Sequence, residues 1–132
     1  MKNPREALSY SLGYNSPIFA QRVHDVFSAI AWDKTRTKGG KSFILSASPS
    51  SLIAAAAAAL AGDAVDGIAI EAADEHPFAK ITDWRDPNLL PGAVKYGDLA
   101  ALIKLIAPRP VILFKNDAER AAAIEKLAGA TK

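Results

Sequence analysis

Hydrophobic residues recur at helical spacing in four segments of the chain. These segments are residues 16–32, 48–61, 98–106 and 117–128. Three short apolar runs separate them, each bounded by turn-forming or charged residues: 42–46, 67–71 and 110–114. Apolar runs of this length are typical of strands buried on both faces. Strands that alternate with helices predict an α/β fold, in which a short parallel sheet of about three strands in sequential order lies between two helical layers.

Two of these helices are predicted to begin with the same pair of residues. Ser16–Pro17 and Ser48–Pro49 each place a serine where an N-cap is favoured and a proline at the first helical position. Asp98 is predicted to be the N-cap of the third helix, and Asp117 to start the fourth. As a helix cap, Ser48 needs no further chemical role.

The pattern predicts one domain over residues 16–132, preceded by an N-terminal arm. Residues 1–15 show no period and are predicted to be an ordered arm at most. The longest stretch without periodicity inside the domain is residues 72–97, which contains several prolines and glycines. Long irregular loops in compact domains are often functional, so this loop is expected to cover a site.

Composition limits the classes of partner and ligand. Lysine and arginine exceed the acids by two, and no basic stripe with interleaved aromatics occurs, so we expect no nucleic-acid partner. The chain has no cysteine, which excludes disulfides and thiolate chemistry. The first 15 residues lack the apolar core of a signal peptide, and the longest apolar stretch, residues 52–61, is too short to span a bilayer. We therefore expect a cytoplasmic protein with no membrane partner, although a fragment of a secreted chain would give the same pattern.

A family resemblance comes from two blocks. Residues 89–114, LLPGAVKYGDLAALIKLIAPRPVILF, resemble the segment before the penultimate strand of α/β-hydrolases of the dienelactone-hydrolase and acetyl-xylan-esterase-like groups. Residues 13–32, GYNSPIFAQRVHDVFSAIAW, resemble the helix that precedes the nucleophile strand in the same enzymes. The resemblance implies that the chain corresponds to the C-terminal half of such a hydrolase, in a degenerate or truncated form.

The resemblance also implies positions for catalytic residues. In the family, the nucleophile lies in a G-x-S-x-G turn after a strand. Ser48 takes that position in Ser46-Ala47-Ser48-Pro49-Ser50, with serines in place of both glycines. Asp117, just after the last apolar run, matches the position of the family's acid.

Three departures from the family pattern count against catalysis. No histidine follows Asp117, so the triad is incomplete. The residue after the nucleophile, which should donate an oxyanion-hole N–H, is Pro49 and has none. The second oxyanion donor of the family comes from an N-terminal strand and loop that we do not recognise in these residues. The resemblance thus leads us to expect a catalytically deficient domain.

His76 is the one histidine that we consider as a substitute base for Ser48, because both follow strands that are expected to be neighbours. The same loop holds Asp74 and Glu75, but consecutive residues rarely converge on one metal ion, so we expect a solvated acidic loop and no metal. We also expect no cofactor.

The sequence leaves three functions open. The leading hypothesis is an interaction domain that self-associates, because strand 42–46 should lack the neighbour that the family's sheet order gives it, and two copies could pair through that edge. The second is an ester or amide hydrolase with Ser48 as nucleophile and Asp117 and His76 in support. The third is small-molecule binding, in which an anion meets the helix N-terminus at Ser46, Ser48, Ser50 and Ser51.

Overall fold

The structure, a computed structural model, describes residue 13 and residues 15–72, 74 and 76–129. Most of the predicted N-terminal arm, residues 1–15, therefore lies outside the described residues. None of the helices described is long and apolar enough to cross a membrane.

Three parallel strands form the sheet, in the order β1-β2-β3. Their bounds are β1 (Phe43–Ser46), β2 (Gly67–Glu71) and β3 (Val111–Phe114). Phe43 pairs with Gly67, and Ile68 pairs with Val111. The predicted fold class is confirmed, and each predicted strand is correct to within one residue.

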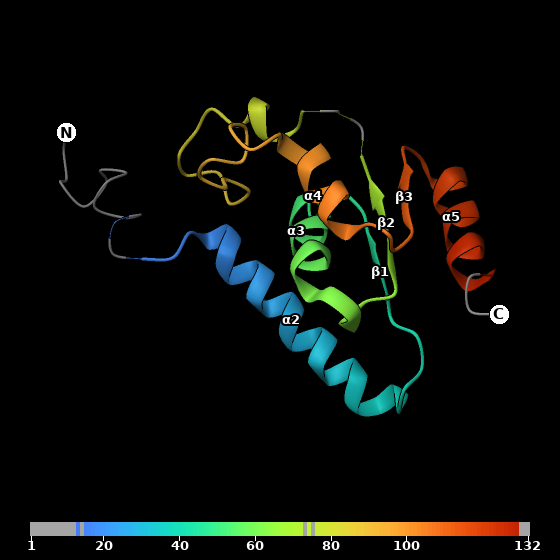
Figure 1. The fold of residues 1–132 in the computed structure, drawn as a ribbon. Helices are drawn as coiled ribbons and strands as arrows, with labels where there is room; N and C mark the ends of the chain where they lie inside the picture. The colour runs from blue at the N-terminus through green and yellow to red at the C-terminus, as the bar shows by residue number, and fades with distance from the viewer. Residues whose placement is uncertain (1–12, 14, 73, 75, 130–132) are drawn as a thin grey trace.

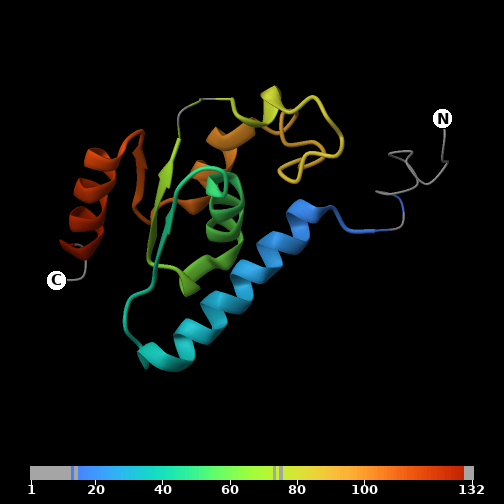
Figure 2. The same cartoon turned by 180° about the vertical axis from the view of Figure 1, so that it is seen from behind.

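Helices cover both faces of this sheet (Figure 1). The helix α5 (Asp117–Gly129) packs on one face, against β2 and β3. On the opposite face lie α3 (Ser51–Ala61) and α4 (Asp98–Ile106), and α2 (Ile18–Thr37) packs against α3. Figure 2 shows α2 running obliquely past the β1 side of the molecule. Two short 3-10 helices, η2 (Gly62–Ala64) and η3 (Phe78–Lys80), complete the described elements.

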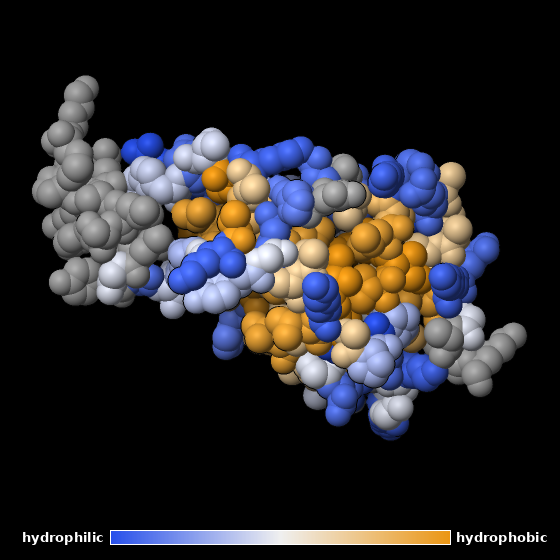
Figure 3. Space-filling view, turned by 45° about the horizontal axis from the view of Figure 1, so that its top comes forward, coloured by the Kyte–Doolittle hydropathy of each residue, from blue (hydrophilic) through white to orange (hydrophobic). Residues whose placement is uncertain are grey.

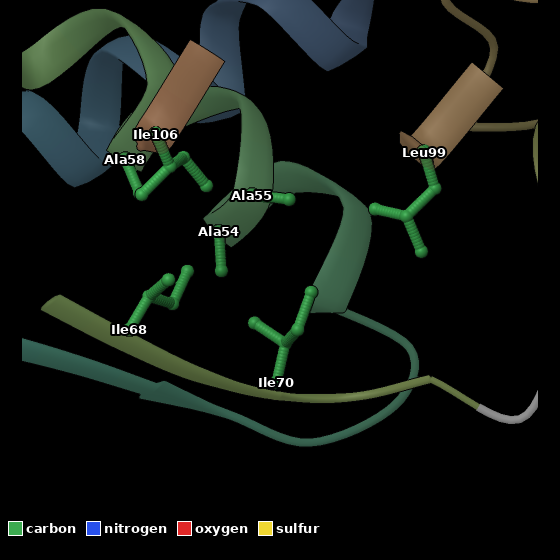
Figure 4. Packing of buried hydrophobic residues seen from close by; sticks show 7 residues of the cluster. All are labelled: Ala54, Ala55, Ala58, Ile68, Ile70, Leu99 and Ile106. Carbon is green, nitrogen blue, oxygen red and sulfur yellow. The ribbon is translucent and has the colours of Figure 1, made fainter. Parts of the chain in front are cut away.

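The alanine-rich helix α3 is the centre of the core. Its small side chains allow β2, α2 and α4 to approach closely, and Ala55, Ala57 and Ala58 are fully buried. Figure 4 shows Ile68 and Ile70 of β2 directed at this helix, with Ile106 of α4 next to Ala58. The alanine run is therefore a packing surface, which agrees with its expected helical state.

The predicted serine N-caps are wrong at both positions. Helix α2 begins at Ile18 with Pro17 as its N-cap, and the side chain of Ser16 makes no capping bond. Helix α3 begins at Ser51 with Ser50 as N-cap, two residues later than predicted. Residues 47–50 instead form a turn, in which the Ser50 N–H donates to the Ala47 carbonyl oxygen at 3.0 Å.

Helix α2 continues to Thr37, about five residues beyond the end predicted near Trp32. Its last turns are held by contacts that periodicity does not show. The Arg36 guanidinium lies 4.6 Å from the centre of the Trp32 ring, and the Ser42 hydroxyl donates to an Asp33 carboxylate oxygen. Asp66 accepts the Ser42 N–H at 2.8 Å, so the end of α2 is fixed to the starts of β1 and β2.

Asp98 is the first residue of α4 rather than its N-cap, which is Gly97. Its buried carboxylate accepts hydrogen bonds from the backbone N–H groups of Phe78 and Ala79 at 3.1 and 3.0 Å. It also accepts one from the backbone N–H of the next residue, Leu99, at 2.7 Å. One carboxylate thus attaches the 3-10 helix η3, near the start of the long loop, to the start of α4. Asp98 also has a positive φ of 56°.

Gly67 is required by the close approach of β2 to its neighbours. A Cβ at this position would lie 2.7 Å from Pro110 Cγ and 3.2 Å from Phe43 Cδ1. We expect Gly67→Ala to lower the free energy of unfolding by about 2 kcal/mol, since overpacking of this kind typically costs about 1–3 kcal/mol. Urea denaturation measures this change. Gly129→Ala is the control, because nothing lies within 4 Å of the added Cβ, and an equal loss in both variants would contradict the steric explanation.

Candidate functional site

The serine-rich turn lies where β1 ends and α3 begins, at the carboxyl edge of the sheet. The Ser48 N–H donates to Glu71 Oε2 at 3.0 Å, which joins this turn to the end of β2. The Ser51 hydroxyl donates to the Ser46 carbonyl oxygen at 3.5 Å. Open α/β sheets bind ligands at this edge, so the turn occupies the expected location for a site.

A pocket of about 200 Å³ opens beside the turn. It is lined by the serine turn, the end of β2, the following loop and the start of α4: Ser48, Pro49, Ser51, Leu52, Glu71, Ala72, Asp74, Pro77, Asn88 and Leu99. The polar groups are mainly hydroxyls and carboxylates. This pocket is where Ser48 would have to act, whether as nucleophile or as ligand-binding residue.

The groups around Ser48 do not favour an anion. The N–H groups of Ser48 and Ser50 already donate within the protein, and Pro49 has none. Two carboxylates, those of Glu71 and Asp74, line the same pocket, although Asp74 is paired with Lys80. A bound anion would therefore meet few free donors and a negative charge at Glu71.

His76 lies in a different hollow from Ser48. It lines a pocket beside α4 and β3, which shares Ala72, Asp74 and Leu99 with the pocket at the serine turn. Among the described residues, no hydrogen bond joins His76 to Ser48. A general base must come within hydrogen-bond reach of the proton that it removes, and this arrangement does not provide that contact.

Asp117 is also apart from the serine turn. It begins α5 after β3, as expected, and its side chain is 88% exposed. Its carboxylate lies 3.1 Å from the Arg120 guanidinium, one turn further along the same helix. The structure therefore does not bring Ser48, His76 and Asp117 together as one hydrogen-bonded set.

Glu71 is the partner that sequence reasoning did not assign to the turn. The sequence pattern places it only at the end of the predicted strand 67–71, since its contact with Ser48 spans 23 residues and has no local signature. Asn88 was also missed. It lines the same pocket, and its Oδ1 atom is buried without a hydrogen-bond partner in the part of the chain described.

The acidic loop is described only in part, because Glu75 lies outside the described residues. Asp74 is paired with Lys80, and His76 is exposed. No group of three histidine, aspartate or glutamate side chains suited to a metal ion occurs within the described ranges.

Comparison of the chain with protein-family models, with curated proteins and with solved structures gave no match. The resemblance to α/β-hydrolases thus stays a prediction from the quoted blocks. What the structure defines is a small α/β domain with a parallel three-stranded sheet and hollows along its carboxyl edge.

Proposed function

We propose that this chain is an interaction domain without hydrolase activity, and that two copies associate through the free edge of β1. One observation carries the proposal. β1 pairs with β2 on one side and, within the described residues, with no strand on the other. An exposed strand edge is a template for pairing with another strand.

The direction of the backbone groups identifies the residues that would pair. The Ser42 carbonyl accepts the Asp66 N–H, so Ser42 points its backbone groups toward β2. Because these groups alternate in direction along a strand, Phe43 and Leu45 point theirs toward the free edge. Leu45 is also 46% exposed, which leaves apolar surface at the same edge.

A groove of about 490 Å³ runs between this edge and α2. Its apolar lining includes Ile44, Leu45 and Val26, and α2 adds one positive and one negative side chain, Arg22 and Asp25. A two-fold interface brings the same patch of both copies together. A patch with one charge of each sign can meet its own copy without net like-charge repulsion, which supports a second copy as the partner.

The absence of hydrolase activity is supported by the placement of the candidate catalytic residues. His76 lines another hollow, Asp117 is exposed and paired with Arg120, and Pro49 lacks the N–H of an oxyanion hole. Loss of one oxyanion donor alone typically costs about 100- to 1000-fold in rate.

We therefore expect a fluorophosphonate probe to leave Ser48 unmodified in the folded protein between pH 6 and 9. Among the described residues, no hydrogen bond joins the Ser48 hydroxyl to a histidine or to a carboxylate, because Glu71 accepts the backbone N–H of Ser48 instead. We therefore expect the hydroxyl to be as weak a nucleophile as that of a surface serine. Intact mass followed by peptide mapping measures the modification, with Ser48→Ala as the matched control. Stoichiometric labelling of Ser48 that disappears in urea would establish an active serine and contradict this proposal.

Sedimentation velocity over a range of concentrations tests the association. We expect a reversible dimer for the natural sequence and a monomer for Leu45→Pro. Proline removes the outward N–H of Leu45 without removing a β1–β2 hydrogen bond, and proline is tolerated on edge strands for that reason.

The matched control is Leu113→Pro. Phe114 and Pro110 direct their carbonyls toward β2, so Leu113 points its N–H away from the sheet, at the free edge of β3. Leu113→Pro should leave the dimer intact. A monomer at all concentrations would contradict the proposal, and so would a dimer that Leu113→Pro disrupts and Leu45→Pro does not.

A further inference from the structure

The second hollow at the carboxyl edge of the sheet has a different chemistry from the pocket at Ser48. It lies between α4 and the end of β3 and has a volume of about 420 Å³, within the range of small-molecule sites. We call it the α4–β3 pocket. Its apolar part is formed by Leu99, Ala100, Ile103 and Leu113, and its polar part by His76, Asp74, Lys115 and Glu119.

Several apolar side chains of this pocket are exposed to solvent. Helix α4, DLAALIKLI, has only two polar residues, yet it is covered by protein on one side only. Ile103 is partly buried against the core, while Ala100 is exposed and Leu113 is 49% exposed. Figure 3, which looks toward the top of Figure 1, shows a broad hydrophobic area in the middle of this face with hydrophilic residues around it.

The charged groups at this pocket are not equivalent. Both carboxylates are already engaged: Asp74 pairs with Lys80, and Glu119 accepts the Lys115 N–H at 2.8 Å and the Asn116 side-chain amide at 2.9 Å. Among the described residues, the ammonium group of Lys115 has no ion pair, and the ring of His76 has no hydrogen bond. As far as the described residues show, the pocket therefore combines an apolar wall with one unpaired cation, Lys115, and one polar ring without a hydrogen bond, His76.

We propose that the α4–β3 pocket binds an amphiphilic carboxylate, such as a medium-chain aliphatic acid. The alkyl chain would lie along Ala100, Ile103 and Leu113, and the carboxylate would pair with the Lys115 ammonium group. A carboxylate fits the free cation, and an alkyl chain fits an apolar wall that presents no hydrogen-bonding side chain. An alkylammonium ion would instead meet Lys115 with like charge, and the carboxylates that could attract it, Glu119 and Asp74, already accept hydrogen bonds or pair with Lys80.

Calorimetric titration with octanoate, kept below its micelle concentration, tests the proposal. We expect saturable binding of one octanoate per chain, with affinity rising about fourfold per methylene from hexanoate to octanoate, as burial of one CH₂ group predicts. Octanol should bind more weakly than octanoate. Equal affinity for octanol would overturn the role of the carboxylate, and the absence of octanoate binding would overturn the site.

Two variants assign the binding to this pocket. Lys115→Gln should weaken octanoate about fivefold, the upper range for an exposed ion pair, and should leave octanol unchanged. Ala100→Trp should abolish binding of both ligands, because an indole at this exposed helical position fills the hollow without replacing a core residue. Lys104→Gln, an exposed lysine of the same helix that lines a different hollow, is the control and should bind octanoate normally.

Octanoate binding that neither Lys115→Gln nor Ala100→Trp alters would place the ligand elsewhere and contradict the proposal. The site is independent of self-association, because the α4–β3 pocket and the free edge of β1 share no lining residue. The Leu45→Pro variant should therefore bind octanoate with the affinity of the natural sequence.

Discussion

Replacement of Ile106 by alanine is expected to lower the free energy of unfolding by about 4 kcal/mol, near the upper end of the range for such core substitutions. Ile106 is fully buried at the end of α4, in the cluster that contains Ala58 and Ile68. A cavity at this position cannot be filled easily, because α3 presents alanines, whose short side chains have no alternative rotamers with which to reach it. The full cost of lost burial and of the cavity should therefore be observed.

Urea denaturation followed by far-ultraviolet circular dichroism measures this loss. The control is Leu105→Ala on the neighbouring residue, which is 64% exposed and should change stability by no more than about 0.5 kcal/mol. A loss below about 1.5 kcal/mol for Ile106→Ala would show that α4 does not pack against α3 and β2 as described.

Replacement of Asp98 is expected to have the second largest effect, a loss of about 3 kcal/mol for Asp98→Ala. Its carboxylate accepts three backbone N–H groups, and hydrogen bonds to charged groups are each worth about 1.5–3 kcal/mol, of which water regains part. The hydrogen bond from the Phe78 N–H is buried, so removal of the carboxylate leaves this N–H group without a partner. Alanine also tolerates the positive φ poorly.

The variant Asp98→Asn separates these contributions. Asparagine tolerates a positive φ and keeps one acceptor oxygen, so it should lose about half as much stability as alanine. Both variants should also become more sensitive to trypsin at Lys80 and Arg85, since η3 would no longer be attached to α4. Asp63→Ala, an exposed aspartate in η2, is the control. Equal stability of Asp98→Ala and the natural sequence would contradict the anchoring role.

The strands were predictable because each is a short apolar run bounded by turn-forming or charged residues, and the central strand β2 is buried along most of its length. Ile68 and Ile70 exemplify this, since both are fully buried beneath α3. The ends of the helices were less predictable. A Ser-Pro pair favours a helix start, but at Ser48 the contact with Glu71 and the turn closed by Ser50 displace the helix to Ser51.

The candidate site was predictable only as a location. Residues that follow parallel strands gather at one edge, and Ser48, His76 and Asp117 do follow the three strands in turn. Which of them come into contact depends on loop paths that have no local signature. That Lys115 has no ion pair among the described residues could likewise not be predicted from the sequence, because it depends on Glu119 being engaged with backbone and amide groups instead.

The most direct test of self-association through β1 is amide hydrogen exchange, residue by residue, at low and high protein concentration. The N–H groups of Phe43 and Leu45 point away from β2, so they are protected only if a second copy covers the edge. We predict that both exchange fast in dilute solution and slowly at concentrations where the dimer forms, while Ile44 is protected at both. Fast exchange of Phe43 and Leu45 at every concentration would show that this edge stays open and would contradict the account.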